Sequence, residues 1–136
     1  MIRLTGEGDT LHLAEVRPDG GVPIGEVNLC WRSQVHRRGE IGFVLHPDHQ
    51  GQGYATEAVH PLLRLGLEDL GLHRIAGRAD ERNSTSAAVL DRLEMRQEAH
   101  LRQNETVAGE WCDEGVYAML ASESTGPIAT SGSAAP

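Results

Sequence analysis

The sequence predicts an α/β protein: a mixed, mostly antiparallel β-sheet with helices packed against it. Residues 10–17 and 23–31 alternate apolar and polar side chains on either side of the turn sequence PDGG. Residues 53–70 carry one apolar stripe at helical spacing. Residues 73–79 form a short apolar segment after that helix, as expected for a strand parallel to the one predicted at 40–45.

The first predicted element is a hairpin. Leu11 and Leu13 alternate with polar residues, and PDGG then supplies glycines that tolerate the positive φ angles of a tight turn. PIGEVNLCW, residues 23–31, alternates again and returns as the second strand. A polar link, RSQVHRRG, leads to the third strand, EIGFVL, at residues 40–45.

The long helix predicted over 53–70 has one irregular feature. Pro61 removes a helix hydrogen bond, which costs about 3 kcal/mol in a regular helix interior. The apolar stripe keeps its spacing on both sides of this proline, so we expect a kink near 57–61 and not a break. The stripe consists of Ala55, Ala58, Val59, Leu62, Leu63, Gly66, Leu67 and Leu70.

The second half of the chain repeats the alternation of strand and helix. NSTSAAVLDRL, residues 83–93, begins with capping residues and predicts a second helix. Two more strands are expected near 96–105 and 110–120. The small, polar residues 125–136 predict a disordered tail, which leaves one domain over 1–124.

Composition excludes several classes of function. The 136 residues carry a net charge of −8, with twelve arginines and no lysine, which argues against a nucleic-acid surface and a lysine-containing phosphate loop. No apolar run approaches the roughly 20 residues that span a membrane. With no secretion signal at the N-terminus, a cytoplasmic location is expected. Cys30 and Cys112 lack metal-site spacing, so no metal is expected.

The segment HQGQGYA precedes the long helix and contains Gly51 and Gly53. Glycines beside a helix N-terminus let main-chain N–H groups approach phosphate oxygens, which the helix dipole also attracts. The alternative is a simple turn with an N-cap. The third glycine of a dinucleotide-binding GxGxxG sequence is absent.

Two further spacings support the phosphate interpretation. Gln50, Gly53 and Ala55 fit Q/R-x-x-G-x-G/A, and Asn83 with Ser86 gives N-x-x-S about thirty residues later. In this order the motifs resemble those of the GNAT acetyltransferases, above all the branch that acetylates ribosomal-protein N-termini. The resemblance extends from about residue 20 to residue 123.

The resemblance implies acetyl-CoA as co-substrate. Its pyrophosphate would bind, largely through main-chain N–H groups, to Gln50, Gly51, Gln52, Gly53, Tyr54 and Ala55. Main-chain groups of Phe43, Val44 and Leu45 would pair with the pantetheine arm where two parallel strands splay apart. Asn83 would bind the same arm, although a helix cap explains this residue equally and the two roles can coexist.

The resemblance also implies direct attack by an amine-bearing acceptor, a peptide N-terminus or a small molecule, on the thioester. Ser86 corresponds to the acid that protonates the leaving thiolate. Glu105 corresponds to the base, and Glu40 is the competing base, since other branches place a carboxylate on that strand. Either glutamate could instead be a solvated strand residue. Leu90 stands where many members carry a catalytic tyrosine, and Tyr117 is expected in the core or groove wall.

Two departures from the family pattern affect these expectations. Glu94 occupies a position where glycine usually ends the helix in a left-handed conformation, which costs glutamate roughly 1 kcal/mol. Family members also begin with a strand and two helices, and the resemblance implies that this sequence starts after them, unless its start is misassigned. The exposed first strand would then favour a homodimer. The alternative function is an acetyl-CoA-binding module with little or no catalysis.

Overall fold

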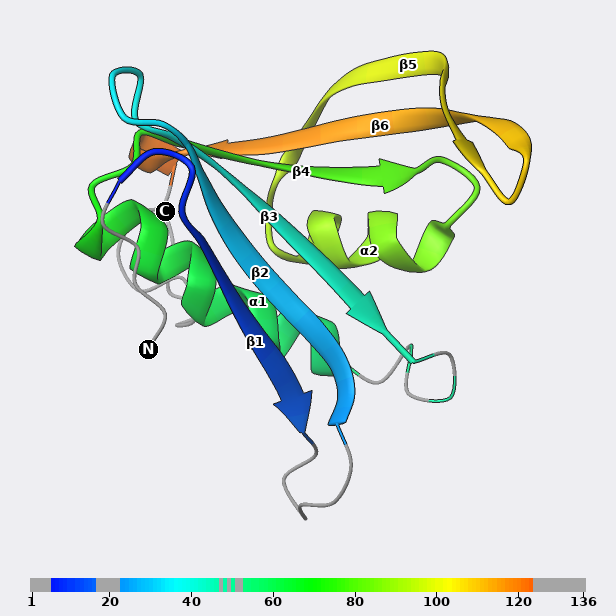
Figure 1. Cartoon of the computed structure of the whole chain (residues 1–136), viewed down its shortest axis with the longest axis horizontal. Coiled ribbons are helices and arrows are strands. Elements are labelled where there is room, and N and C mark those ends of the chain that lie inside the picture. The colour runs from blue at the N-terminus through cyan, green and yellow to red at the C-terminus, as the bar shows by residue number, and fades with distance from the viewer. Residues whose placement is uncertain (1–5, 17–22, 47, 49, 51–52, 124–136) are drawn as a thin grey trace.

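A computed structural model describes residues 6–16, 23–46, 48, 50 and 53–123. The described strands form one six-stranded sheet in the order β1-β2-β3-β4-β6-β5 (Figure 1). Their bounds are β1 (Thr10–Val16), β2 (Pro23–Ser33), β3 (Arg38–Leu45), β4 (Arg74–Asp80), β5 (Arg96–Val107) and β6 (Glu110–Leu120). Every predicted strand is therefore present, and several are longer than the sequence pattern indicated.

The sheet is antiparallel except at one pair. β1 with β2, β2 with β3, β4 with β6, and β5 with β6 all run antiparallel, whereas β3 and β4 run parallel. A parallel pair needs a crossover connection, and the helix between β3 and β4 provides it. The predicted mixed α/β class and the parallel relation of β3 to β4 are both confirmed.

The crossover helix α1 spans Tyr54–Arg64 and continues into a five-residue π-helical turn, η2 (Leu65–Asp69). The α-helix runs through Pro61 unbroken, as the continuous stripe indicated. The irregular turn lies downstream of the position that we predicted for a kink. It ends where the Leu70 amide donates to the Leu65 carbonyl, 2.9 Å away. A single π turn of this kind adds one residue to a helix.

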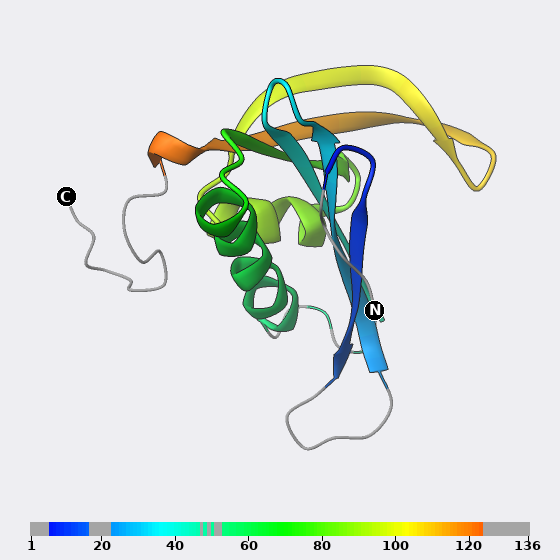
Figure 2. The same cartoon turned by 60° about the vertical axis from the view of Figure 1, so that its left-hand side comes forward.

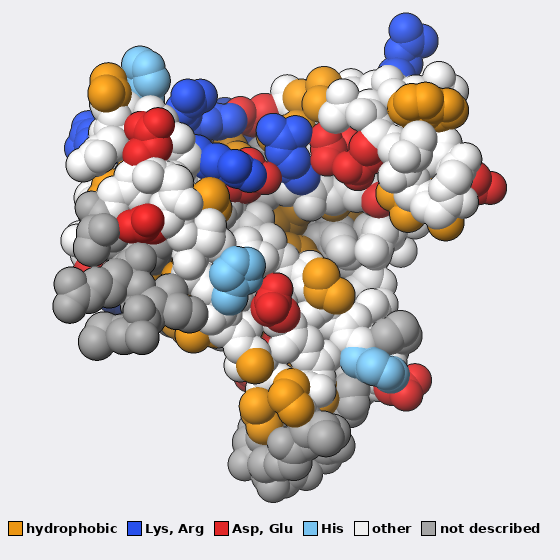
Figure 3. Space-filling model, viewed as in Figure 1, with side chains coloured by type: hydrophobic (Ala, Val, Ile, Leu, Met, Phe, Trp, Pro, Cys, Tyr) orange, Lys and Arg blue, Asp and Glu red, His pale blue; other side chains and the backbone are white. Residues whose placement is uncertain are grey.

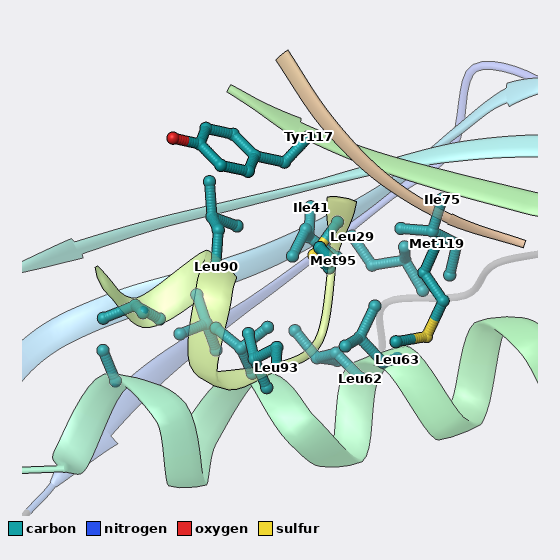
Figure 4. Packing of buried hydrophobic residues seen from close by; sticks show 14 of the residues in the cluster. Leu29, Ile41, Leu62, Leu63, Ile75, Leu90, Leu93, Met95, Tyr117 and Met119 are labelled. Atoms are coloured by element: carbon teal, nitrogen blue, oxygen red, sulfur yellow. The ribbon is translucent and has the colours of Figure 1, made fainter. Parts of the chain in front are cut away.

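Both helices pack against the same face of the sheet (Figure 2). The second helix, α2, spans Ser84–Arg92. The side chains between sheet and helices are buried completely or nearly so, and each contributes about 2 kcal/mol relative to an exposed position. Those labelled in Figure 4 are Leu29, Ile41, Leu62, Leu63, Ile75, Leu90, Leu93, Met95, Tyr117 and Met119.

Helix α2 ends with a left-handed residue, as the family pattern requires. Glu94 has φ 65°. Its amide donates to the Asp91 carbonyl at 2.9 Å, and the Met95 amide donates to the Leu90 carbonyl at 3.1 Å. These two hydrogen bonds define a Schellman motif, completed by the packing of Met95 and Leu90 in one core cluster. The predicted conformation is thus confirmed, with glutamate in glycine's place.

Three other expectations concern the periphery. β1 lies at one edge of the described sheet, as predicted. Among the described residues, no helix is long and apolar enough to cross a membrane. The PDGG turn and the predicted disordered tail at 125–136 lie outside the described residues.

Candidate functional site

The parallel strands β3 and β4 separate partway along their length. They pair only from Arg38 with Arg74 to Ile41 with Gly77, while β3 continues to Leu45 and β4 to Asp80. Figure 1 shows the two strands diverging with α2 beside the opening. Main-chain groups of β3 beyond Ile41 therefore have no β4 partner. This is the splayed pair that the sequence resemblance implied.

A pocket of about 520 Å³ lies at this opening. Its walls come from the end of β3, the N-terminus of α1 and the length of α2. The predicted cofactor residues that line it are Phe43, Val44, Leu45, Gln50, Gly53, Ala55, Asn83 and Ser86. Tyr54 is not among the lining residues. Gly51 and Gln52 lie outside the described residues.

The mouth of α1 has the geometry of an anion site. Gly53 is the N-cap with φ 85°, a left-handed conformation that favours glycine, and no side chain caps this helix end in the described structure. Gln50 fixes the loop, because its side-chain amide donates to the Leu45 carbonyl at 3.0 Å. The partial positive charge at the start of an eleven-residue helix therefore faces the pocket, and Glu57, the acidic residue of the first turn, does not line it.

The other wall begins at a capped helix. The Asn83 side-chain oxygen accepts a hydrogen bond from the Ser86 amide at 3.0 Å, which confirms the helix-cap role. The cap uses the amide oxygen, so a ligand contact by Asn83 would use the amide nitrogen. Ser86 lines the pocket one turn into the same helix.

Sequence reasoning missed several pocket residues. Thr85, Val89 and Arg92 line the pocket along one side of α2. They follow the N-x-x-S motif and lie three to four residues apart, which is the spacing of neighbours on one side of a helix. This spacing could have predicted them. Thr56 also lines the pocket, and its hydroxyl oxygen is buried with no hydrogen-bond partner among the described residues.

The charge of the pocket is positive. Arg92 is the one charged side chain among the described lining residues. Together with the α1 N-terminus, it favours a ligand that carries phosphate or another anion. Tyr117 lies nearby in the core, 7% exposed and packed beside Leu90 (Figure 4), as expected. Burial, with the carboxylates of Glu81 and Asp91, raises the pKa of Tyr117.

Neither predicted base lines the pocket. Glu105 is exposed on β5, where it pairs across the strands with Cys112 in the β5–β6 hairpin. Glu40 is half-buried on β3, one residue before the last paired position. Its carboxylate lies 3.5 Å from Nε of Arg32 and 3.4 Å from Nε of Arg78. The structure thus brings Glu40, and not Glu105, next to the strand opening.

No cluster of three or more possible metal-ligating side chains occurs in the described ranges. Cys112 is buried and Cys30 half-buried, and both are free thiols. Burial raises the pKa of the Cys112 thiol. This disfavours its thiolate form, which is the nucleophilic one.

Comparison with known proteins agrees with this geometry. Residues 3–96 match the family model described as an acetyltransferase (GNAT) domain. The chain is 37% identical over 84 residues to the uncharacterized N-acetyltransferase YnaD of Bacillus subtilis, covering 62% of this chain and 49% of YnaD. It is 32% identical over 99 residues to the putative ribosomal N-acetyltransferase YdaF of Bacillus subtilis, covering 73% of this chain and 54% of YdaF.

A solved structure shares the fold. The spermidine N-acetyltransferase SpeG F149A mutant from Vibrio cholerae superposes with a TM-score of 0.76 at 22% identity, over 86% of this chain and 69% of that chain. The chain spans about half the length of YnaD and YdaF. With more than half of its residues matched by the family model, the chain belongs to the GNAT acetyltransferase family.

Proposed function

We propose that this protein is an acetyl-CoA-dependent N-acetyltransferase that moves an acetyl group to a primary amine. The observation that carries the proposal is the convergence of three features on one pocket. These features are the uncapped N-terminus of α1, the N-x-x-S segment of α2, and the unpaired edge of β3. Each supplies a different kind of group toward one elongated, phosphate-bearing ligand.

The pocket residues fit the parts of acetyl-CoA. Main-chain N–H groups at the mouth of α1 suit the pyrophosphate. Arg92 would add a charge-assisted contact to a phosphate. Phe43, Val44 and Leu45 would offer main-chain groups to the amides of pantetheine, as an added strand does.

The chemistry requires a neutral amine, a held thioester and a proton for the departing thiolate. Acetyl-CoA supplies the thioester. The amine nitrogen forms the new C–N bond as the C–S bond breaks, and Ser86, which lines the pocket, would donate the proton to sulfur. The base that accepts the amine proton is Glu105 or Glu40. The position of Glu40 beside the strand opening supports Glu40 as the base.

Two measurements test the proposal. The first is thiol release from acetyl-CoA in the presence of each of a panel of amines and short peptides, and the second is binding of acetyl-CoA by calorimetry. We expect binding, and turnover with at least one amine. The variants Glu40→Gln and Glu105→Gln identify the base, because loss of one carboxylate should abolish turnover while acetyl-CoA still binds. Absence of acetyl-CoA binding would contradict the proposal.

A second function, an acetyl-CoA-binding module with little catalysis, is favoured by one observation. No carboxylate or histidine lines the described pocket, so a general base must come from outside it. Tight acetyl-CoA binding without turnover against any amine would establish this alternative.

A further inference from the structure

The face of the sheet opposite α1 and α2 carries a second hollow, of about 610 Å³. It lies over the paired half of β3 and β4, and its lining includes Arg32, Arg38, Glu40, Arg74, Ala76 and Arg78. Figure 3 shows arginine side chains gathered over the upper part of this face. Four arginines from three strands thus meet on a protein whose net charge is −8.

The arginines are only partly neutralised. Glu40 contacts Arg32 and Arg78, Glu98 lies 2.7 Å from Arg74, and Glu114 lies 3.1 Å from Arg78. Three carboxylates therefore face four guanidinium groups. Arg38 is exposed and makes no ion pair within the described part of the chain.

The strand register places two of these arginines side by side, and Glu98 pairs with only one of them, Arg74. Arg38 pairs directly with Arg74 across the parallel strands β3 and β4. Like charges placed opposite each other destabilise a sheet, and an anion bound between them removes that cost. Three interleaved carboxylates also interrupt the positive surface, which suits a small anionic group better than a continuous phosphate backbone.

The hollow adjoins the reaction centre expected from the proposed function. β3 lines both cavities, and its pairing with β4 stops at Ile41 and Gly77, next to Glu40. A thioester lying at the opening could be approached from this second face. An acceptor there would have its amine beside Glu40 and the rest of the molecule among the arginines.

Building on the proposed N-acetyltransferase function, we propose that the acceptor carries an anionic group close to its amine, as in an α-amino acid or a peptide with an acidic residue near its N-terminus. Its amine lies by Glu40, and its carboxylate binds Arg38 and Arg74. The solved structure that shares the fold is named a spermidine N-acetyltransferase, and spermidine is a polycation. The arginine hollow would repel such an acceptor.

The test compares two tripeptide amides, Ala-Asp-Ala and Ala-Asn-Ala, with spermidine as a third acceptor, by kcat/KM at fixed acetyl-CoA. We expect the Asp peptide to be preferred by about tenfold, the scale of one hydrogen bond to a charged group. Arg38→Gln should remove most of this preference with little change for the Asn peptide. Arg64→Gln is the matched control, since Arg64 at the end of α1 pairs with Glu68 of η2 at 3.1 Å and lies outside the hollow.

The outcomes separate this inference from the proposed function. Equal kcat/KM for the two peptides, or preference for spermidine, overturns the anionic acceptor while leaving an N-acetyltransferase. A preference that survives Arg38→Gln overturns the role of the hollow. Acetyl-CoA binding without acetylation of any acceptor overturns both the proposed function and the anionic acceptor that rests on it.

Discussion

At the scale of single residues, Glu94 holds a backbone conformation that its side chain disfavours. Its φ of 65° belongs to the Schellman motif that ends α2, and glycine adopts this conformation without the steric cost. Glu94→Gly should raise the free energy of unfolding by about 1 kcal/mol, measured by urea denaturation. Glu94→Ala is the control, because alanine removes the carboxylate but keeps the strain. Equal stabilisation by both variants would show that charge, not conformation, limits stability.

Asn83 has two separable roles. Its oxygen caps α2 through the Ser86 amide, and its side chain also lines the pocket. Asn83→Ala should lower the free energy of unfolding by about 1 kcal/mol through loss of the cap. Asn83→Asp keeps an accepting oxygen and should retain stability, yet weaken acetyl-CoA binding because it replaces the amide donor with a negative charge. Calorimetry with both variants checks this, and full acetyl-CoA affinity in Asn83→Asp would limit Asn83 to capping.

At the scale of elements, we expect the backbone conformation at the N-terminus of α1 to govern acetyl-CoA binding. Gly53 has φ 85°, and a Cβ added there would meet no atom within 4 Å, so the cost of Gly53→Ala is conformational and not steric. We expect a loss of stability of about 1 kcal/mol and a clear loss of acetyl-CoA affinity, since the start of the helix must shift.

The β5–β6 turn offers a matched control for Gly53→Ala. Gly109 has φ 82°, has equally open space around its missing Cβ, and does not line the pocket. Gly109→Ala should cost similar stability while leaving acetyl-CoA affinity unchanged. If both alanine variants bind acetyl-CoA as the unchanged protein does, the mouth of α1 is not the anion site.

At the scale of the whole molecule, the sequence predicted the order of elements because alternation and helical spacing are local properties. The pocket followed from motifs that sit at the ends of those elements. The π-helical turn η2 was missed, since it leaves no periodic signature and the apolar stripe passes through it. The opposite hollow was also missed, because it depends on which residues of distant strands become neighbours.

The position of Glu105 relative to the pocket was also not predictable from the sequence. Its distance from the pocket depends on the path of β5, where the register shifts between Leu101 and Glu105 and Gln103 takes a φ of 49°. Irregularities of this kind bend and twist a strand. The sequence in this stretch is polar and carries no glycine or proline that would have indicated the shift.

The β5–β6 hairpin is tied to the rest of the molecule by a histidine that lies between two carboxylates. His100 on β5 lies 3.0 Å from the Glu81 carboxylate, in the connection between β4 and α2, and 2.6 Å from the Asp113 carboxylate on β6. The hydrogen bond with Asp113, followed by the charge of Glu81, raises the pKa of His100. The same hydrogen bond lowers the pKa of Asp113.

The signs of these shifts fix the pH range of the stabilisation. A raised histidine pKa adds stability that is complete below its unfolded value of about 6.5 and is lost as pH rises through the folded pKa. A lowered aspartate pKa adds stability that is complete above about 3.9 and is lost in acid. The contribution of the pair is therefore greatest between those two values.

His100→Gln should consequently destabilise the protein at pH 5.5 and have a smaller effect at pH 9, because glutamine keeps hydrogen-bonding capacity but cannot carry the positive charge. Urea denaturation of both proteins at the two pH values measures the difference. His36→Gln is the control, since His36 is exposed in the β2–β3 turn and makes no ion pair within the described ranges. An effect of His100→Gln that stays constant with pH would mean that His100 acts through packing, and that its charge does not hold the hairpin.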